Sequence, residues 1–161
     1  MQPTSVSYAL MSIADWDRDN CSVARALELI GDRHTVLVLR EAFVGERRFD
    51  RIQRHTGVAR NILSDRLNKL VVHGILTRRP YQERPVRHEY VLTEKGLDLY
   101  PVLVSLMQWG MRHGNGDTAI LLQHKGCGAI VEPHLACPEC GERVAARDMR
   151  AVRDEAIANT A

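Results

Sequence analysis

Two short helical patterns joined by a tight turn constrain the fold of this chain more than any other feature. Apolar residues at helical spacing predict one helix from Phe49 to about His55 and a second from about Ala59 to His73. Thr56-Gly57 lies between them, and glycine permits the backbone that such a turn needs. The buried stripe of the second helix is expected to be Ile62, Leu63, Leu67, Leu70 and Val71. This spacing is typical of a helix-turn-helix unit.

The two segments that follow predict a β-hairpin. Residues Ile75–Tyr81 and Arg87–Leu92 have strand-like patterns and would pair across residues 82–86. Pro80 and Pro85 suit only an edge strand or a loop, as in a wing that projects from the domain. The expected class is therefore mainly α with a small hairpin (α+β), a winged helix-turn-helix.

Positive charge is concentrated on the same part of the chain. Residues 46–88 contain 11 Lys and Arg against four Asp and Glu, a local balance of +7 in a chain whose net charge is +2. Such a face suits a phosphate backbone. Aromatic residues make up only 5% of the 161 residues, which argues against single-strand binding by base stacking. Double-stranded DNA is the expected partner.

The outward positions of the second helix are candidate base readers. Arg60, Asn61, Ser64 and Asp65 lie near its N-terminus, and Arg pairs with guanine and Asn with adenine in the major groove. Other basic residues are expected to contact phosphates, and the hairpin pair Arg84 and Arg87 a minor groove or flanking backbone. The expected phosphate contacts are Arg47, Arg48, Arg51, Arg54, Arg66 and Lys69. The alternative for any one arginine is that it only solubilises a small helical domain.

Helices are also expected on both sides of this unit. Val23, Ala26, Leu27 and Ile30 predict a helix that Gly31 ends, and Asp32 can cap the next, which Gly45 ends. The core face of that second helix is expected to be Val36, Leu37, Leu39, the Arg40 stem and Phe43. Thr93 can cap a long helix from Glu94 to about His113, kinked at Pro101. That helix is apolar around most of its circumference, so a second copy of the chain is expected to cover one side.

An ordered series of motifs resembles the HxlR-type winged helix-turn-helix transcription regulators. The motifs are Cys21-Ser-Val-Ala-Arg-Ala-Leu-Glu-Leu-Ile-Gly-Asp-Arg, Leu39-Arg-Glu-Ala, Arg48-Phe-Asp-Arg-Ile, Leu63-Ser-Asp-Arg-Leu-Asn-Lys-Leu and Glu89-Tyr-Val-Leu-Thr-Glu-Lys-Gly. The resemblance covers about residues 15–113. It implies a homodimer that binds a pseudo-palindromic operator, with the terminal helices at the dimer contact. Ser22 stands where the family often has Pro, and His34 where it often has Trp.

Cys21 precedes the first predicted helix, where the helix dipole favours a thiolate and the nearby Asp17 and Asp19 oppose it. The resemblance implies a sensor of oxidants or electrophiles at this place, since some members of the family use a cysteine there. The alternative is a small buried side chain that packs in the dimer contact. A small-molecule signal is a further alternative, because the apolar helices predicted at residues 22–43 and 94–113 could enclose a pocket between two subunits.

A second, separate motif lies near the C-terminus. His124 and Cys127, then Cys137 and Cys140, each form a ligand-x-x-Cys-Gly sequence of the kind found in zinc knuckles. Three thiolates and one imidazole can complete a tetrahedral Zn²⁺ site, with His134 as a competing fourth ligand. The alternative is a thiol-disulfide redox enzyme that uses Cys137 and Cys140.

These patterns predict four parts: an N-terminal arm (1–20), the DNA-binding domain with its terminal dimerisation helices (21–113), a zinc-ribbon-like module (118–149) and a flexible tail (150–161). No apolar run is long enough to span a bilayer and no leader peptide is recognisable, so a cytoplasmic protein is expected. No catalytic constellation is present, which favours a regulator over an enzyme. Repression by operator occlusion is the expected mode. The remaining alternative is an RNA-associated interaction module.

Overall fold

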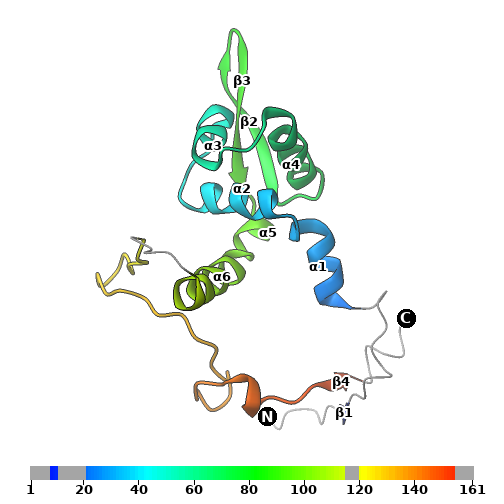
Figure 1. Cartoon of the computed structure of the whole chain (residues 1–161), viewed down its shortest axis with the longest axis vertical. Helices are drawn as coiled ribbons and strands as arrows, with labels where there is room; N and C mark the ends of the chain where they lie inside the picture. The colour runs from blue at the N-terminus through cyan, green and yellow to red at the C-terminus, as the bar shows by residue number, and fades with distance from the viewer. Residues whose placement is uncertain (1–7, 11–20, 115–119, 155–161) are drawn as a thin grey trace, which may run out of the picture. The chain divides into compact units, whose positions relative to one another are not determined.

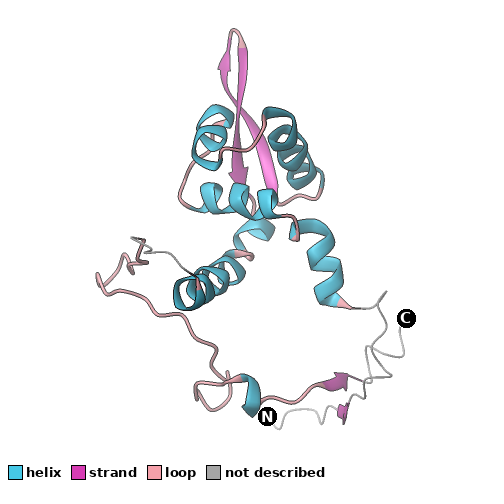
Figure 2. Ribbon diagram, viewed as in Figure 1, coloured by secondary structure: helices cyan, strands magenta, loops and turns pink. Residues whose placement is uncertain are grey.

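The computed structural model describes residues 8–10, 21–114 and 120–154. The chain divides into two units, one of residues 22–120 and one that combines residues 1–21 with residues 121–161. The first unit is mainly helical and contains one antiparallel hairpin, which confirms the expected α+β class (Figure 2). No helix of the described residues is both long and apolar enough to cross a membrane.

The first unit has six helices and two strands among its described residues, in the order α1-α2-α3-α4-β2-β3-α5-α6 (Figure 1). The helix-turn-helix consists of α3 and α4, and the hairpin follows directly. The bounds are α1 Ser22–Ile30, α2 Arg33–Phe43, α3 Phe49–Thr56, α4 Arg60–Val72, β2 Leu76–Glu83, β3 Val86–Leu92, α5 Glu94–Leu97 and α6 Tyr100–His113.

The start of α2 is as predicted, but its buried face is so only in part, with Leu39 in the core as expected. The Asp32 carboxylate accepts hydrogen bonds from the backbone N–H groups of His34 and Thr35, so it caps the helix. Thr35, Val38 and Leu39 are buried, whereas Arg40 is exposed. The prediction of Val36 and Leu37 as core residues was wrong, because the face at positions 35, 38, 39 and 42 is the one turned toward the other helices.

One core holds α2, α3, α4 and the base of the hairpin together. Its most deeply buried members are aliphatic and come from all of these elements, and Tyr90 closes it from β3. The members are Val38, Leu39, Ile52, Val58, Leu63, Leu67, Leu70, Ile75, Leu76 and Tyr90. Ile62 and Val71, which the sequence also assigned to the α4 stripe, are half-buried against this core.

The hairpin extends past α3 and α4 as a wing (Figure 1). Leu76 pairs with Leu92 at its base and Glu83 with Val86 at its tip, so its turn is shorter than the predicted loop of residues 82–86. The register shifts between Pro80 and Gln82. Because the sheet has only two strands, Pro80 needs no partner on its outer edge.

The predicted helix from Glu94 to His113 is two helices. Thr93 caps α5 as expected, with its hydroxyl accepting a hydrogen bond from the Gly96 backbone N–H. The helix ends at Leu97, and α6 starts at Tyr100 with Pro101 in its first turn. The backbone N–H groups of the first helical turn have no partner within the helix, so a proline there costs no hydrogen bond. Pro101 therefore lies at the start of a helix, where the sequence predicted a kink within one. Val104 of α6 is buried, and the Tyr100 ring packs on Phe43 of α2 with centroids 5.4 Å apart.

The second unit contains a strand pair that the sequence did not suggest. β1 (Tyr8–Leu10) pairs antiparallel with β4 (Val152–Asp154), so part of the predicted arm pairs with part of the predicted tail. The rest of the arm before residue 21, residues 115–119 and the chain after Asp154 lie outside the described residues. A short 3-10 helix, η2 (Ala146–Asp148), precedes β4.

Candidate nucleic-acid interface

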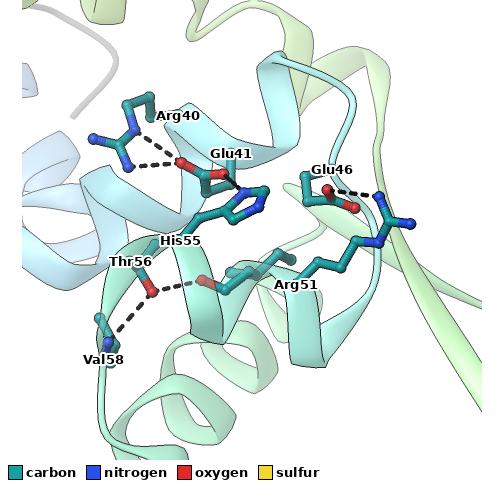
Figure 3. Close-up of polar contacts among 8 residues, drawn as sticks. Arg40, Glu41, Glu46, Arg51, His55, Thr56 and Val58 are labelled. Atoms are coloured by element: carbon teal, nitrogen blue, oxygen red, sulfur yellow. Dashed lines mark hydrogen bonds and ion pairs between the residues drawn. The ribbon is translucent and has the colours of Figure 1, made fainter.

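The turn between α3 and α4 is held by local hydrogen bonds. Gly57 has a φ of 66°, which an L side chain rarely adopts. The Thr56 hydroxyl donates to the Ile52 carbonyl at 2.7 Å and accepts from the Val58 backbone N–H at 3.4 Å. Val58 is buried immediately afterwards. These contacts set the direction in which α4 leaves the turn (Figure 3).

A buried carboxylate also ties α2 to the end of α3, and sequence reasoning missed it. The Glu41 side chain is 6% exposed, accepts two hydrogen bonds from Arg40 at 3.0 and 2.6 Å, and lies 2.8 Å from Nδ1 of His55 (Figure 3). His55 is 14 residues away on another helix, so no helical spacing in the sequence links the two. The only sequence signal is a charged residue on the inward face of α2.

The N-terminal half of α4 presents the predicted base-reading residues. Arg60, Asn61 and Asp65 are exposed and Ser64 is half-buried. All four lie in the first two turns of a helix whose other face supplies Leu63 and Leu67 to the core. Three of the four residues predicted to point outward are therefore exposed.

Two cation–π contacts join this helix start to the wing. The Arg60 guanidinium lies 5.0 Å from the ring centroid of Phe49, at the start of α3. Arg48, the residue before Phe49, lies 4.7 Å from the ring of Tyr81 in β2. A backbone hydrogen bond also connects the segment before α3 to the wing: the Tyr90 N–H of β3 donates to the Arg47 carbonyl at 2.8 Å. The sequence could not predict these contacts, since they join three elements.

The remaining predicted basic residues fall into two groups. Arg47, Arg51, Arg54, Arg84 and Arg87 are exposed, and Arg51 pairs with Glu46 at 3.6 Å. Arg66 and Lys69 instead contact the junction of α1 and α2: Arg66 Nε lies 2.9 Å from an Asp32 carboxylate oxygen, and Lys69 Nζ donates to the Glu28 carbonyl.

Asp32 thus serves both as a helix cap and as the partner of Arg66. Burial acts to raise the pKa of Asp32, but the Thr35 N–H, the charge and hydrogen bond of Arg66 and the His34 N–H together hold that pKa below its ordinary value. The carboxylate therefore stays charged between α2 and α4 at neutral pH.

Comparisons with known proteins now place this domain. Residues 29–118 match the family described as HxlR-like helix-turn-helix, which is more than half of the chain. The chain belongs to this family. An uncharacterised HTH-type transcriptional regulator of Mycobacterium tuberculosis, Rv3095, is 48% identical over 130 residues, which is 80% of this chain and 82% of that protein. That alignment is longer than the segment matched by the family.

Solved structures of transcription regulators share the fold. PA1607, described as a candidate transcription factor, is 38% identical with a TM-score of 0.75, covering 84% of this chain and 96% of that one. The redox regulator HypR in its oxidised form is 29% identical with a TM-score of 0.55, covering 61% of this chain and all of that one. This chain is accordingly a DNA-binding transcription regulator with a winged helix-turn-helix domain.

The predicted metal ligands form two separate pairs. Nδ1 of His124 lies 3.2 Å from the Cys127 sulfur. The backbone N–H groups of Cys140 and Glu139 and the Cys140 side chain hydrogen-bond to the Cys137 sulfur, and these contacts lower the pKa of the Cys137 thiol. Among the described residues, no three His, Cys, Asp or Glu side chains gather closely enough to hold a metal ion. His134, the competing ligand, faces the Glu132 carbonyl at 3.3 Å.

Cys21 directly precedes α1, as predicted, and its thiol is free and half-buried. It lies 106 positions or more before the other three cysteines, which are all in the C-terminal module.

Proposed function

We propose that this HxlR-like regulator is a homodimer that represses transcription by occupying a pseudo-palindromic operator. The observation that carries the proposal is the exposed N-terminal half of α4, joined by Arg60, Phe49, Arg48 and Tyr81 to strand β2 of a basic wing. A helix of this kind fits the major groove, where Arg60 and Asn61 would read base edges. Ser64 and Asp65, one turn later, would complete the reading surface.

Phosphate contacts would flank that helix. Arg48, Arg51 and Arg54 around α3, and Arg84 and Arg87 on the wing, are exposed and have the charge to do so. Arg66 and Lys69 fit a different role in this proposal, because both are engaged with the α1–α2 junction. They would orient α4 and leave the DNA contacts to the other basic residues.

The dimer is proposed from apolar surface that the single chain leaves exposed. α1 has no buried residue, and its Leu27 is 57% exposed. On α6, Leu106 and Trp109 are 52% and 64% exposed. A nine-residue helix is marginal in water without tertiary packing, so a second copy that covers α1 and α6 would stabilise both. The two winged helix-turn-helix domains of the dimer would then bind half-sites about 34 Å apart.

Selection of genomic fragments by the purified protein at near-physiological salt, followed by sequencing, tests the proposal. We expect an inverted repeat with half-sites about one helical turn apart. Arg60→Ala should relax the base preference at defined positions of the operator, whereas Arg84→Ala should weaken binding to all DNA sequences alike. Retention of fragments without any shared motif, or preference for structured RNA at matched salt, would contradict the proposal.

A redox response through Cys21 is a second proposal, supported by the similarity to the redox regulator HypR. Oxidation by diamide should release DNA from the parent protein and not from Cys21→Ser. Because the chain has three other cysteines, a variant with serine at Cys127, Cys137 and Cys140 serves as the control. If Cys21→Ser lost DNA as readily as the parent, the sensor would not be at this position.

A further inference from the structure

Residues 122–144 contain the same backbone turn twice, thirteen positions apart. The Gly128 N–H donates to the His124 carbonyl at 2.8 Å, and the Gly141 N–H to the Cys137 carbonyl at 2.8 Å. Both turns are closed by a strand-like bridge, Gln123 to Ile130 in one and Ala136 to Arg143 in the other. The outer bonds match as well: Val131 N–H to Leu122 carbonyl at 2.7 Å, and Val144 N–H to Leu135 carbonyl at 3.0 Å.

Each turn places its two candidate ligands at equivalent positions. His124 and Cys137 begin the two turns, Cys127 and Cys140 end them, and the following Gly128 and Gly141 have φ values of 74° and 75°. The glycine lets the chain reverse tightly enough for backbone N–H groups to point back at the first ligand, as those of Glu139 and Cys140 do at Cys137. A repeat that conserves ligand position, glycine and hydrogen bonds is a feature of metal knuckles, and ordinary turns do not require it.

The module has no apolar core to account for its fold. None of the described side chains in residues 120–152 is buried. Most of the large apolar residues are exposed, namely Ile120, Leu121, Ile130, Val131, Leu135 and Met149, and only Leu122 and Val144 are half-buried. A segment this small that buries so little needs another source of stability, and the common sources are disulfides and structural metals.

We propose that the two knuckles close together on one Zn²⁺ ion per chain, ligated by His124, Cys127, Cys137 and Cys140. Three thiols and an imidazole are soft and borderline donors that favour zinc over magnesium or calcium. Binding would draw the two ligand pairs to about 2.0–2.3 Å from one ion. The three thiols lose their protons to solvent, the imidazole binds in its neutral form, and no oxidant or reductant takes part.

Titration of the full chain, reduced and stripped of metal, with Co²⁺ and then Zn²⁺ tests the site. We expect saturation at one Co²⁺ per chain, with the visible absorption of a tetrahedral sulfur-rich site that Zn²⁺ then abolishes. Amide hydrogen exchange in residues 122–144 should slow on Zn²⁺ addition. Saturation at one ion per two chains, or no slowing of exchange, would overturn a four-ligand site within one chain.

Matched variants assign the ligands. His124→Ala and Cys140→Ser should each weaken Co²⁺ binding by about 100-fold or more, whereas His134→Ala and Cys21→Ser should leave it unchanged. A loss in His134→Ala with none in His124→Ala would overturn the ligand set. A metal-independent disulfide between Cys137 and Cys140, with faster reduction of insulin by dithiothreitol, would favour the redox enzyme instead. DNA selection by the same variants separates failure of this site from failure of the proposed function.

Discussion

At the scale of single residues, the contact between Glu41 and His55 is the clearest case of a side chain whose role depends on the fold. Glu41 is buried, and His55 supplies one of its three polar contacts. His55→Ala should therefore lower the free energy of unfolding by about 1.5–3 kcal/mol, the range for a hydrogen bond to a charged group. Urea unfolding of His55→Ala against Arg54→Ala, an exposed neighbour, measures this. Equal midpoints for the two variants would show that Glu41 needs only Arg40.

Asp32 makes a pH-dependent contribution with a definite sign. Because its pKa is lower in the folded than in the unfolded chain, its stabilisation is complete above its ordinary value of about 3.9 and is lost as pH falls through the lowered value. Asp32→Asn keeps a capping oxygen but loses the charge opposite Arg66. We expect Asp32→Asn to be less stable than the parent at pH 7 and the two to converge once the pH falls below the lowered pKa of Asp32. A gap that persists at acid pH would assign the effect to packing.

Sequence reasoning identified residues whose role is local and missed those whose role is tertiary. Asp32 and Thr93 were recognised as caps because a cap depends on residues two or three positions away. Val36 and Leu37 were placed in the core in error because several apolar residues are consecutive in α2 and only the packing of α3 and α4 decides which face is buried. The contacts of Glu41 and Arg66 join separate helices and leave no periodic signal.

At the scale of elements, the close approach of α5 to the start of β2 explains a glycine in a helix. A Cβ on Gly96 would lie 2.2 Å from the Ile75 carbonyl oxygen and 2.9 Å from a Leu92 methyl carbon. Gly96→Ala should lower the free energy of unfolding by about 1–3 kcal/mol, because the backbone of β2 or α5 must shift. Gly110→Ala in α6 is the control, since no atom of the described residues outside its chain neighbours and its own helix backbone would lie within 4 Å of its Cβ. Thermal unfolding should separate the two variants. A Gly96→Ala protein as stable as Gly110→Ala would mean that α5 moves freely.

The division into α5 and α6 shows what sequence reasoning can resolve about an element. Pro101 was correctly identified as incompatible with an undisturbed helix. Whether a helix bends or ends at a proline depends on the contacts that hold the turn before it. Here the Thr93 hydroxyl donates a hydrogen bond to the Gly74 carbonyl, and Gly96 is buried. Those contacts come from the α4–β2 turn, about twenty positions earlier, so they could not be inferred from the helix itself.

At the scale of the whole molecule, the proposed dimer and the proposed DNA contacts make one joint prediction. Replacing Leu106 and Trp109 together with Gln removes exposed apolar surface without changing the charge. If α6 lies in the dimer contact, the variant should sediment as a monomer where the parent is a dimer. Val72→Gln, an apolar residue that is 80% exposed at the end of α4, is the matched control and should remain dimeric. A Leu106→Gln/Trp109→Gln variant that stayed dimeric would place the contact elsewhere.

The same variant predicts how DNA affinity depends on salt. Each neutralised phosphate contributes about −0.9 to the slope of log K against log salt concentration. A dimer that binds two half-sites neutralises twice as many phosphates as one winged helix-turn-helix domain. The slope of the monomeric variant should therefore be about half that of the parent. The DNA affinity of the variant should fall as well. The slope distinguishes loss of the dimer from unfolding, because unfolding would abolish binding without halving its salt dependence. Fluorescence anisotropy on the selected operator over a range of salt concentrations measures both. An unchanged slope in a monomer would mean that one headpiece makes all the phosphate contacts, and the two-fold operator would then have no physical basis.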